Sequence, residues 1–325
     1  MTPAGERTLE GKPEIPTRDT GPCMGDAAAP VEIVARGYDF EYRSCVNRFE
    51  IRRHADGGPW YVFPQPAPEA LDVIYPPDYG PFQFEQLRGP SRWARDLVQR
   101  MKAMRILRSA GGRGKILDVG TGSGMLLRQL RQIGVPAEDL YANDFSEHSL
   151  RALANEGFSI LPGPAEHIET DERFQVICLN QVLEHMSQPV DVVRRLAGLL
   201  RPGGALFIET PSTDGIDCRL FRKRYWGGFH FPRHFHLFNE QTLRQLLADA
   251  GLDVREVTYL ASPAFWIQCF HHRLYDAGWF RVARLFTIKN PMLLAAATIV
   301  DRCTVLAGGR TSNIRIVGTK PSETP

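Results

Sequence analysis

The segment from Ile116 to Gly124, Ile-Leu-Asp-Val-Gly-Thr-Gly-Ser-Gly, constrains the fold more than any other part of the chain. A short apolar run leads into a loop with glycine at positions 120, 122 and 124, and an amphipathic leucine-containing stretch follows. Glycine has no Cβ, so such a loop can turn sharply and bring its backbone close to a ligand. The spacing is GxGxG, whereas the dinucleotide fingerprint GxGxxG would need glycine at Met125. The segment therefore predicts a strand–loop–helix unit that holds a ligand.

The remainder of the chain beyond Ser91 alternates between strand-like and helix-like segments. Helices are expected over Trp93–Leu107, after the glycine loop, from Ser146, along the stripe Val192–Leu200, and from an N-cap at Asn239. Strands are expected near residues 115–119, 140–143, 158–161, 174–180, 205–209, 254–260 and 313–319. Alternation at this spacing predicts an α/β fold with a doubly wound, mostly parallel sheet covered on both faces.

The bulk properties are those of an ordinary globular protein, with 43% hydrophobic and 23% charged residues and a formal charge of +2. This balance favours neither a nucleic-acid partner nor stable membrane insertion. The apolar stretch from Pro291 to Gly308 is interrupted by Asp301 and Arg302, so we expect a buried or interfacial helix there. No signal peptide is recognisable, and the six cysteines lack a disulfide-framework spacing, so a cytoplasmic location is expected.

The N-terminal part has a different composition from the rest of the chain. Residues 1–30 are rich in proline, glycine, alanine and charge, which predicts a flexible tail. Residues 31–88 contain short β-like runs at Val31–Ala35 and Trp60–Phe63, followed by a proline-rich stretch, which predicts a small lobe. The main domain is then expected to span residues 89–325.

Two carboxylates mark the ligand site. Asp118 lies in the strand before the glycine loop, where it can meet a ligand ammonium group or brace the loop. Asp144 follows the second strand, where a carboxylate can accept hydrogen bonds from both hydroxyls of a ribose. An acid at this position suits NAD as well as other nucleosides, and a lone aspartate there can also be a helix cap.

Four motifs in order resemble class I S-adenosylmethionine-dependent methyltransferases. They are ILDVGTGSG, NDFS, FQVICLNQVLEHMSQPVDVVRRLAGLLRPGGALFIETPS and HFHLFNEQTLRQLLADAGLDV. The resemblance covers about residues 90–320 and is strongest to the branch containing ubiquinone-biosynthesis O-methyltransferases and enzymes of sugar and natural-product clusters. It implies a seven-stranded Rossmann-like methyltransferase sheet and S-adenosylmethionine as cofactor.

The resemblance also implies the cofactor-binding residues. The glycine loop would line the cofactor, Asp144 would hold the ribose, and Asn180 with Gln181 would lie beside the methionine moiety. The stretch after the third strand has Pro164 where relatives often have Asp, which leaves Ala165 and Glu166 as the adenine contacts. The complete expected set is Asp118, Gly120, Thr121, Gly122, Gly124, Asp144, Phe145, Ala165, Glu166, Asn180 and Gln181.

Histidines supply the candidate proton acceptors. The equivalents of His185, His234 and His236 lie near the pocket in relatives, while His230 fits the family pattern less well. Imidazole is the natural base for an oxygen or nitrogen nucleophile near neutral pH. His185 could equally brace a loop, and the others could simply pack in an aromatic lid. No carboxylate lies at ligand spacing among them in the sequence, so we expect no metal there. The nearby basic run could grip an anionic substrate such as a nucleotide sugar, or be a solvated surface; its members are Arg222, Lys223, Arg224 and Arg233.

The N-terminal lobe resembles a degenerate zinc ribbon. Relatives often carry two CxxC pairs about 30 residues apart. Here the corresponding stretches are Cys23-Met24-Gly25-Asp26 and His54-Ala55-Asp56-Gly57, so three of four thiolates are missing. A structural zinc site depends on four filled positions, so we expect the lobe to hold no metal.

The sequence therefore predicts a methyltransferase acting on a hydroxyl of a small molecule, such as a sugar or another secondary metabolite. N-methylation on the same scaffold remains open, and so does a cofactor-binding protein without catalysis. An NAD-dependent oxidoreductase is disfavoured by Met125 and by the absence of a Tyr-x-x-x-Lys pair. A nucleic-acid methyltransferase is disfavoured because the fourth strand ends in Leu-Asn-Gln-Val rather than an asparagine–proline motif.

Overall fold

The structure is a computed structural model that describes residues 4–26, 28–76, 90–109, 111 and 114–322, with the backbone alone for residues 90–95. A seven-stranded sheet forms its centre, in the order β12-β13-β10-β9-β6-β7-β8. Strand β13 runs antiparallel to both of its neighbours, and the other neighbouring pairs are parallel. The predicted mostly parallel seven-stranded sheet is therefore confirmed. The strands are β6 (Ile116–Val119), β7 (Leu140–Asp144), β8 (Ser159–Pro162), β9 (Phe174–Asn180), β10 (Leu200–Pro211), β12 (Asp253–Leu260) and β13 (Asn313–Thr319).

Helices cover both faces of this sheet, because successive strand residues point to opposite sides. In β9, Ile177 and Leu179 join one apolar cluster with α6 (Pro189–Leu199) and α8 (Glu240–Asp249), while Val176 and Cys178 join another. The second cluster contains α3 (Pro90–Ser109), α4 (Met125–Gln132) and α5 (Glu147–Asn155). The side chain of Asn239 caps α8 as expected, and the side chain of Ser146 caps α5, which begins next to it. Short 3-10 turns complete the connections: η4 (Ala137–Asp139), η5 (Ala165–His167) and η6 (Leu183–His185).

A second, four-stranded antiparallel sheet has the order β11-β4-β3-β2. Its first three strands in the chain are β2 (Val31–Gly37), β3 (Phe49–His54) and β4 (Gly57–Phe63), and its fourth, β11 (His236–Leu237), comes from the main part of the chain. The apolar cluster beneath it mixes Tyr38 and Phe49 with Trp226 and Phe229. The N-terminal sheet is thus completed and packed by residues some 180 positions later.

Residues 4–26 do not form the predicted flexible tail. Leu9, at the end of η1 (Glu6–Leu9), and Ile15 are buried in the core of the N-terminal sheet. Glu6 forms ion pairs with Arg48 at 2.6 Å and Arg224 at 2.8 Å. Composition indicated disorder, but two apolar side chains and one carboxylate find partners far along the chain. The remaining short elements are β1 (Thr17–Arg18), β5 (Gln65–Pro66), η2 (Pro68–Ala70) and α1 (Leu71–Ile74).

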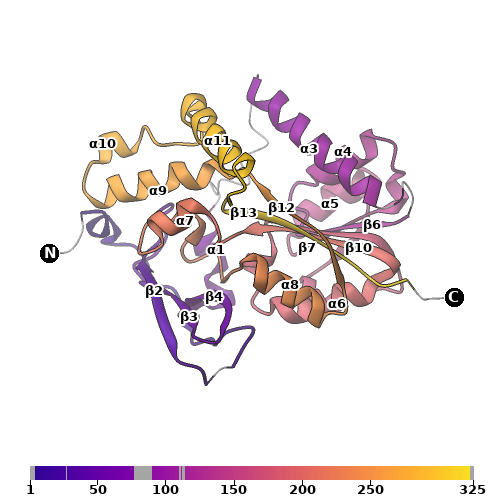
Figure 1. Cartoon of the computed structure of the whole chain (residues 1–325), viewed down its shortest axis with the longest axis horizontal. Coiled ribbons are helices and arrows are strands. Elements are labelled where there is room, and N and C mark those ends of the chain that lie inside the picture. Colours follow the sequence, from indigo (N-terminus) through magenta and orange to yellow (C-terminus); the bar gives the residue numbers. More distant parts are fainter. Residues whose placement is uncertain (1–3, 27, 77–89, 110, 112–113, 323–325) are drawn as a thin grey trace.

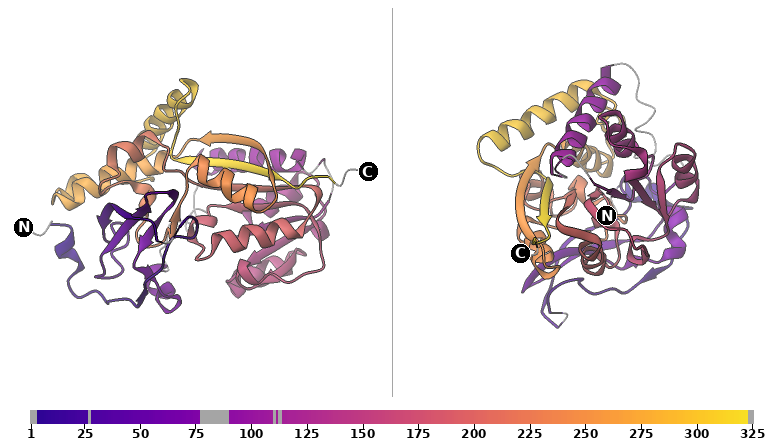
Figure 2. Two further views of the ribbon diagram at one scale, coloured as in Figure 1. Left: turned by 60° about the horizontal axis from the view of Figure 1, so that its bottom comes forward. Right: turned by 90° about the vertical axis from the view of Figure 1, so that its right-hand side faces the viewer.

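Three helices project between β12 and β13: α9 (Pro263–Asp276), α10 (Phe280–Ala283) and α11 (Pro291–Leu306). Together with α7 (Ile216–Phe221) and η7 (Gly227–Phe229) they lie at one end of the main sheet, and α11 points away from the body (Figures 1 and 2). Of the two expectations for this stretch, a buried or an interfacial helix, the structure excludes the buried one, since Asp301 is the sole buried residue of α11. Among the described residues, no helix is long and apolar enough to span a membrane.

Candidate cofactor and acceptor site

Polar side chains gather where the parallel strands end. Asp118 lies in β6, Asp144 ends β7, Asn180 ends β9 and Glu209 lies near the end of β10. Strand β13 runs antiparallel to β10 and leads toward the C-terminus. The carboxyl ends of the parallel strands therefore lie at the other end of the sheet, which faces the N-terminal sheet and α7 (Figure 1). Ligands of such sheets bind at this edge.

The glycine loop requires its glycines for two different reasons. Gly120, Gly122 and Gly124 all have positive φ angles, +64°, +53° and +75°, which side chains rarely adopt. A Cβ on Gly124 would also lie 2.3 Å from Leu153 Cδ2, so this glycine allows α4 and α5 to pack. A Cβ on Gly122 would meet nothing within 4 Å, so the outer side of the loop is open to a ligand.

Asp118 and Asp144 hold this loop from both sides. Asp118 accepts hydrogen bonds from Thr121 Oγ1 at 2.9 Å and Asn180 Nδ2 at 3.4 Å, and burial raises its pKa to about 6. Asp144 accepts from Gly122 N at 2.8 Å and Ser146 N at 2.9 Å. Both aspartates therefore have a structural role in the loop, which the sequence left open, besides any contact with a ligand.

Of the remaining expected cofactor contacts, Phe145 directly follows Asp144, and Ala165 and Glu166 lie in η5. Phe145 is 73% exposed and offers a flat apolar surface beside that carboxylate. Ala165 is buried in η5, and Glu166 beside it is half-buried. Asn143 donates to the carbonyl oxygens of Leu161 and Gly163, and these two hydrogen bonds hold the segment that leads into η5.

Lys102 on α3 lies at the site but was not among the residues predicted from the sequence. It forms an ion pair with Glu209 and donates to Asn180 Oδ1 at 3.3 Å, so it links two strand ends. Arg315 on β13 pairs with the same glutamate. The sequence does mark Glu209, because it is a charged residue at the end of the apolar run that begins at Ala205. The lysine has no such signal, because only the packing of α3 brings it to this edge.

Gln181 adopts a left-handed conformation, with φ of +56°. A side chain in this region costs about 1 kcal/mol or more and tends to occur at functional sites. Its backbone N–H donates to the Glu209 carbonyl at 2.8 Å, and its Nε2 donates to Asn313 Oδ1 at 3.1 Å. The strained turn directs the chain from β9 into η6, which carries His185.

Three histidines from distant parts of the chain meet beside this turn. The ring centroids of His185 and His234 are 4.8 Å apart, as are those of His230 and His234. His230, which the sequence ranked below the others, is thus a full member of the group. His236 instead packs near Phe238 and donates from Nδ1 to the Met186 carbonyl at 3.0 Å, where it braces β11.

Hydrogen bonds fix the tautomers of His185 and His234. Their Nδ1 atoms lie 2.9 Å from the Arg233 carbonyl and 2.8 Å from the Gly228 carbonyl, and a carbonyl can only accept, so Nδ1 carries the proton. The Tyr75 hydroxyl, 3.0 Å from the same His185 Nδ1, then accepts from it as well. In the neutral ring this leaves the Nε2 lone pair available. Burial lowers the pKa of His185 to about 3 and that of His234 well below its usual value, so both rings stay neutral.

His230 differs because it has a carboxylate partner. Glu41 Oε2 lies 2.9 Å from His230 Nδ1. Burial alone would raise the pKa of Glu41, but the charge and hydrogen bond of His230 lower it below its usual value. The histidine also has a positive φ of 41°. An imidazole oriented by a carboxylate is the arrangement of many general bases.

The prediction that no carboxylate lies at ligand spacing among these histidines was wrong. Ligand-type atoms of Glu184, His185 and His234 all lie within 4.8 Å of one another. Glu184 is fully buried, accepts from Thr210 Oγ1 at 2.8 Å, and has no partner among the described residues for its Oε1. Burial raises its pKa to about 8, so the side chain is a neutral acid at pH 7. The strand ending at Asn180 and the loop 227–236 create this cluster, which sequence spacing hides.

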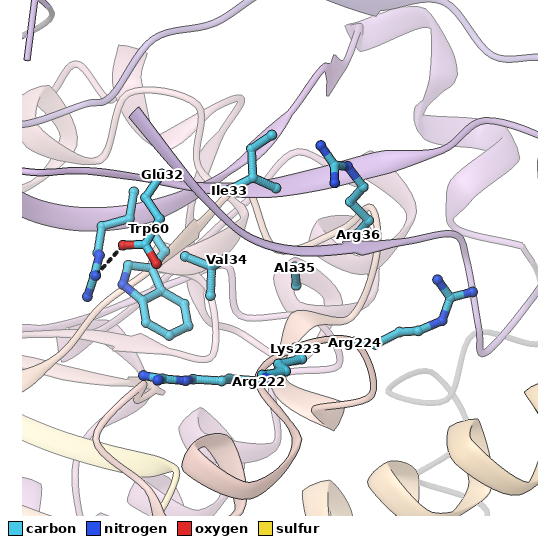
Figure 3. Close-up of a pocket in the computed structure, with 10 residues that line it drawn as sticks. Glu32, Ile33, Val34, Ala35, Arg36, Trp60, Arg222, Lys223 and Arg224 are labelled. Carbon is cyan, nitrogen blue, oxygen red and sulfur yellow. Dashed lines mark hydrogen bonds and ion pairs between the residues drawn. The ribbon is translucent and has the colours of Figure 1, made fainter. Parts of the chain in front are cut away.

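The four basic residues between positions 222 and 233 lie in two different environments. Arg233 is fully buried and pairs with Asp39, so it cannot grip a solvent-borne anion. The other three residues line an open pocket of about 450 Å³ against β2 and Trp60 (Figure 3). Arg224 is held there by ion pairs with Glu6 and Asp276.

The two turns that correspond to zinc knuckles lie side by side, joined by hydrogen bonds. Asp56 Oδ2 accepts from Asp26 N at 2.6 Å. His54 uses both ring nitrogens, since Nδ1 contacts the Asp26 carbonyl at 3.0 Å and Nε2 contacts the Tyr61 hydroxyl at 3.0 Å. Burial raises the pKa of the Cys23 thiol to about 12, which disfavours the thiolate that would bind a metal.

Comparison with known proteins gives the same assignment as the geometry. The sequence profile of the methyltransferase domain family matches residues 88–257, more than half of the 325 residues. A ubiquinone biosynthesis O-methyltransferase of Aeromonas salmonicida is 32% identical over 165 residues, which are 46% of this chain and 68% of that protein. Its counterpart in Bordetella avium is 31% identical over 104 residues, which are 30% of this chain and 42% of that protein.

The chain thus spans less than half the length of the Bordetella relative. Among solved structures, the CcbJ methyltransferase from Streptomyces caelestis aligns with 74% of this chain and 95% of its own, at 13% identity and a TM-score of 0.47. The open, glycine-lined end of β6, with Asp144 and Asn180 beside it, fits the nucleoside and amino-acid parts of S-adenosylmethionine, the cofactor of the family. The chain belongs to the class I S-adenosylmethionine-dependent methyltransferases.

Proposed function

We propose that the chain methylates a hydroxyl group of a small molecule, with the acceptor held between the strand ends and the histidine group. The observation that carries this proposal is the contact of His185, His230 and His234 next to the end of β9. The relatives are named O-methyltransferases, which supports a hydroxyl acceptor.

The cofactor supplies an activated methyl group, so the protein's work is alignment and proton removal. Gly120, Gly122 and Gly124 would receive the amino-acid part, and Asp144 would exchange its bond to Gly122 N for the ribose hydroxyls. Phe145, Ala165 and Glu166 would border the adenine. Asp118 and Asn180, tied to each other and to Lys102, would position the methionine end, with Thr121 and Gln181 completing the surround.

Within the histidine group, we assign the proton acceptor to His230. A general base works best with a pKa near the operating pH, and burial makes His185 and His234 weak bases. Proton uptake by His230 completes an ion pair with Glu41. The Nε2 lone pairs of His185 and His234 can accept a hydrogen bond from the acceptor hydroxyl and so orient it. His236 has a bracing role in β11.

The test is transfer from cofactor labelled in its methyl group to a panel of catechol-type and sugar acceptors, at saturating cofactor. His230→Ala should lower kcat by about a hundredfold or more, the usual contribution of a general base. Glu41→Gln should lower kcat less and shift the acid limb of the pH–rate profile. His148→Ala, on exposed α5, is the control. A product methylated on nitrogen, or full activity of the His230 variant, would contradict the proposal.

A further inference from the structure

Helices α10 and α11 with their connections, residues 277–306 (the arm), expose an unusual number of large apolar side chains. Leu306 is 87% exposed, Met292 78%, Leu285 63% and Trp279 62%, and Ile299 is exposed to a similar degree. Both helices pack on α9, and α11 projects from the body of the molecule (Figure 2). A monomeric soluble protein rarely gathers so many exposed apolar side chains in one segment.

The exposed side of α11 is apolar along its whole length. Met292, Ala296, Ile299, Cys303 and Leu306 follow one another at steps of four and three residues, which places them on one face, and all five are exposed. Leu293, Leu294 and Ala297 are half-buried, so α11 carries apolar side chains on its inner side as well as on its exposed side.

Asp301 fixes this orientation from the inner side of α11. Its carboxylate accepts from Ser262 N at 2.6 Å and from Trp266 Nε1 at 2.8 Å, and the residue is 1% exposed. Turning the apolar face inward would break both bonds and expose the partners. The fold therefore holds the apolar face toward the outside.

The exposed charges of the arm have one sign. Between residues 263 and 310 the acids are Asp276 and Asp301, and both are buried. Arg281, Arg284, Lys289 and Arg302 are exposed, and none of them forms an ion pair with a described residue. The formal charge of +2 for the whole chain conceals this local cluster.

We propose that the arm docks on the surface of an anionic lipid bilayer, with its apolar side chains at the headgroup boundary and its basic side chains against lipid phosphates. An apolar face flanked by Lys and Arg is the pattern of helices that lie in the interface. Each basic residue near such a surface strengthens binding about fivefold, and Trp279 has the amphipathic ring that favours this zone. A second copy fits less well, because a two-fold interface would set the same basic cluster against itself.

The test is flotation of the full chain with vesicles of phosphatidylcholine alone, or with an equal amount of phosphatidylglycerol. Binding should require phosphatidylglycerol and weaken with salt. Leu285→Glu and Leu306→Glu should abolish it, whereas Leu220→Glu on α7, 66% exposed, should bind like the parent. The double variant Arg281→Gln/Arg284→Gln should bind roughly thirtyfold more weakly, from two lost contacts of about 1 kcal/mol each.

Adenosylhomocysteine binding and melting temperature are measured on every variant, so loss of fold or of the cofactor site is seen separately from loss of vesicle binding. The proposal does not depend on which acceptor is methylated. It is overturned if the parent stays with the protein fraction in both vesicle preparations, or if the leucine variants of the arm float like the parent. A dimer in light scattering that Leu306→Glu dissociates, without any vesicle binding, would assign the face to a second copy instead.

Discussion

Arg233 and Asp39 form a bidentate ion pair in which both side chains are fully buried, with Nη1–Oδ1 and Nη2–Oδ2 distances of 3.0 Å. Burial opposes ionisation of Asp39, but Arg233 lowers its pKa to about 2. Arg233 also donates from Nε to the Ile74 carbonyl, and its own carbonyl accepts from His185. The pair therefore joins the N-terminal lobe to the histidine group.

Removing one partner of this pair should strongly destabilise the protein. Arg233→Gln leaves a buried, unpaired carboxylate, and we expect a loss of about 3–5 kcal/mol in the free energy of unfolding. The matched change Arg194→Gln removes an exposed helix pair with Asp191 and should cost at most about 0.5 kcal/mol. Urea denaturation measures both; equal losses would show that the buried pair has no special role.

The buried histidines should make the fold labile to acid. Burial lowers the pKa of His236 and His272 to about 4 and that of His185 to about 3, so these rings bind protons in the unfolded chain before they do in the folded one. Stability should therefore fall as pH drops below about 6.5, by up to about 1.4 kcal/mol per pH unit for each ring, until the folded pKa is reached.

Urea denaturation over a pH series measures that slope. His236→Gln should flatten it, and the exposed His148→Gln should leave it unchanged. Glu184 has the opposite effect on stability. Because burial raises its pKa to about 8, its stabilising contribution is present below about pH 4.5 and is lost as pH rises toward 8. Burial also raises the pKa values of Asp118, Asp217 and Asp301, which act in the same sense as Glu184. Below pH 6.5 we expect the four buried histidines to outweigh these carboxyls. A stability that rises on acidification would contradict the buried, neutral state of the rings.

Two glycines of the cofactor loop should respond differently to alanine. Gly124→Ala combines a φ of +75° with a clash against Leu153, so we expect a loss of about 1–3 kcal/mol in stability. Gly122→Ala meets open space, so it should cost about 1 kcal/mol from φ alone and weaken adenosylhomocysteine binding roughly tenfold. Thermal denaturation and calorimetric titration separate the two effects. Unchanged binding by the Gly122 variant would remove this loop surface from the cofactor site.

Metal analysis tests both clusters of possible ligands. His54 already uses both ring nitrogens, and Glu184 is neutral at pH 7, so we expect purified protein to carry no stoichiometric ion and EDTA to leave the melting temperature unchanged. One ion per chain would contradict this expectation. Its loss in Cys23→Ser would locate it in the N-terminal lobe, and its loss in Glu184→Gln would locate it among the histidines.

Local sequence rules determined the main sheet. Apolar periodicity placed its seven strands, a helix starts near Ser146 and Asn239 caps another as expected, because caps and strand burial depend on residues close in the chain. The glycine loop and Asp144 marked the cofactor end for the same reason: the conformations they need are set locally, by missing Cβ atoms and a strand end.

The tertiary structure decided which residues surround the cofactor end of the main sheet. The sequence separates Glu41 from His230, and Lys102 from Glu209, by more than 100 residues, and only tertiary packing brings each pair into contact. The buried Leu9 departed from expectation, and the sequence left open whether α11 is buried or interfacial, because composition measures how apolar a segment is, not which partner it finds. The cofactor end could be predicted from local geometry, while the proton-accepting group and the exposed arm depend on contacts that no short stretch of sequence contains.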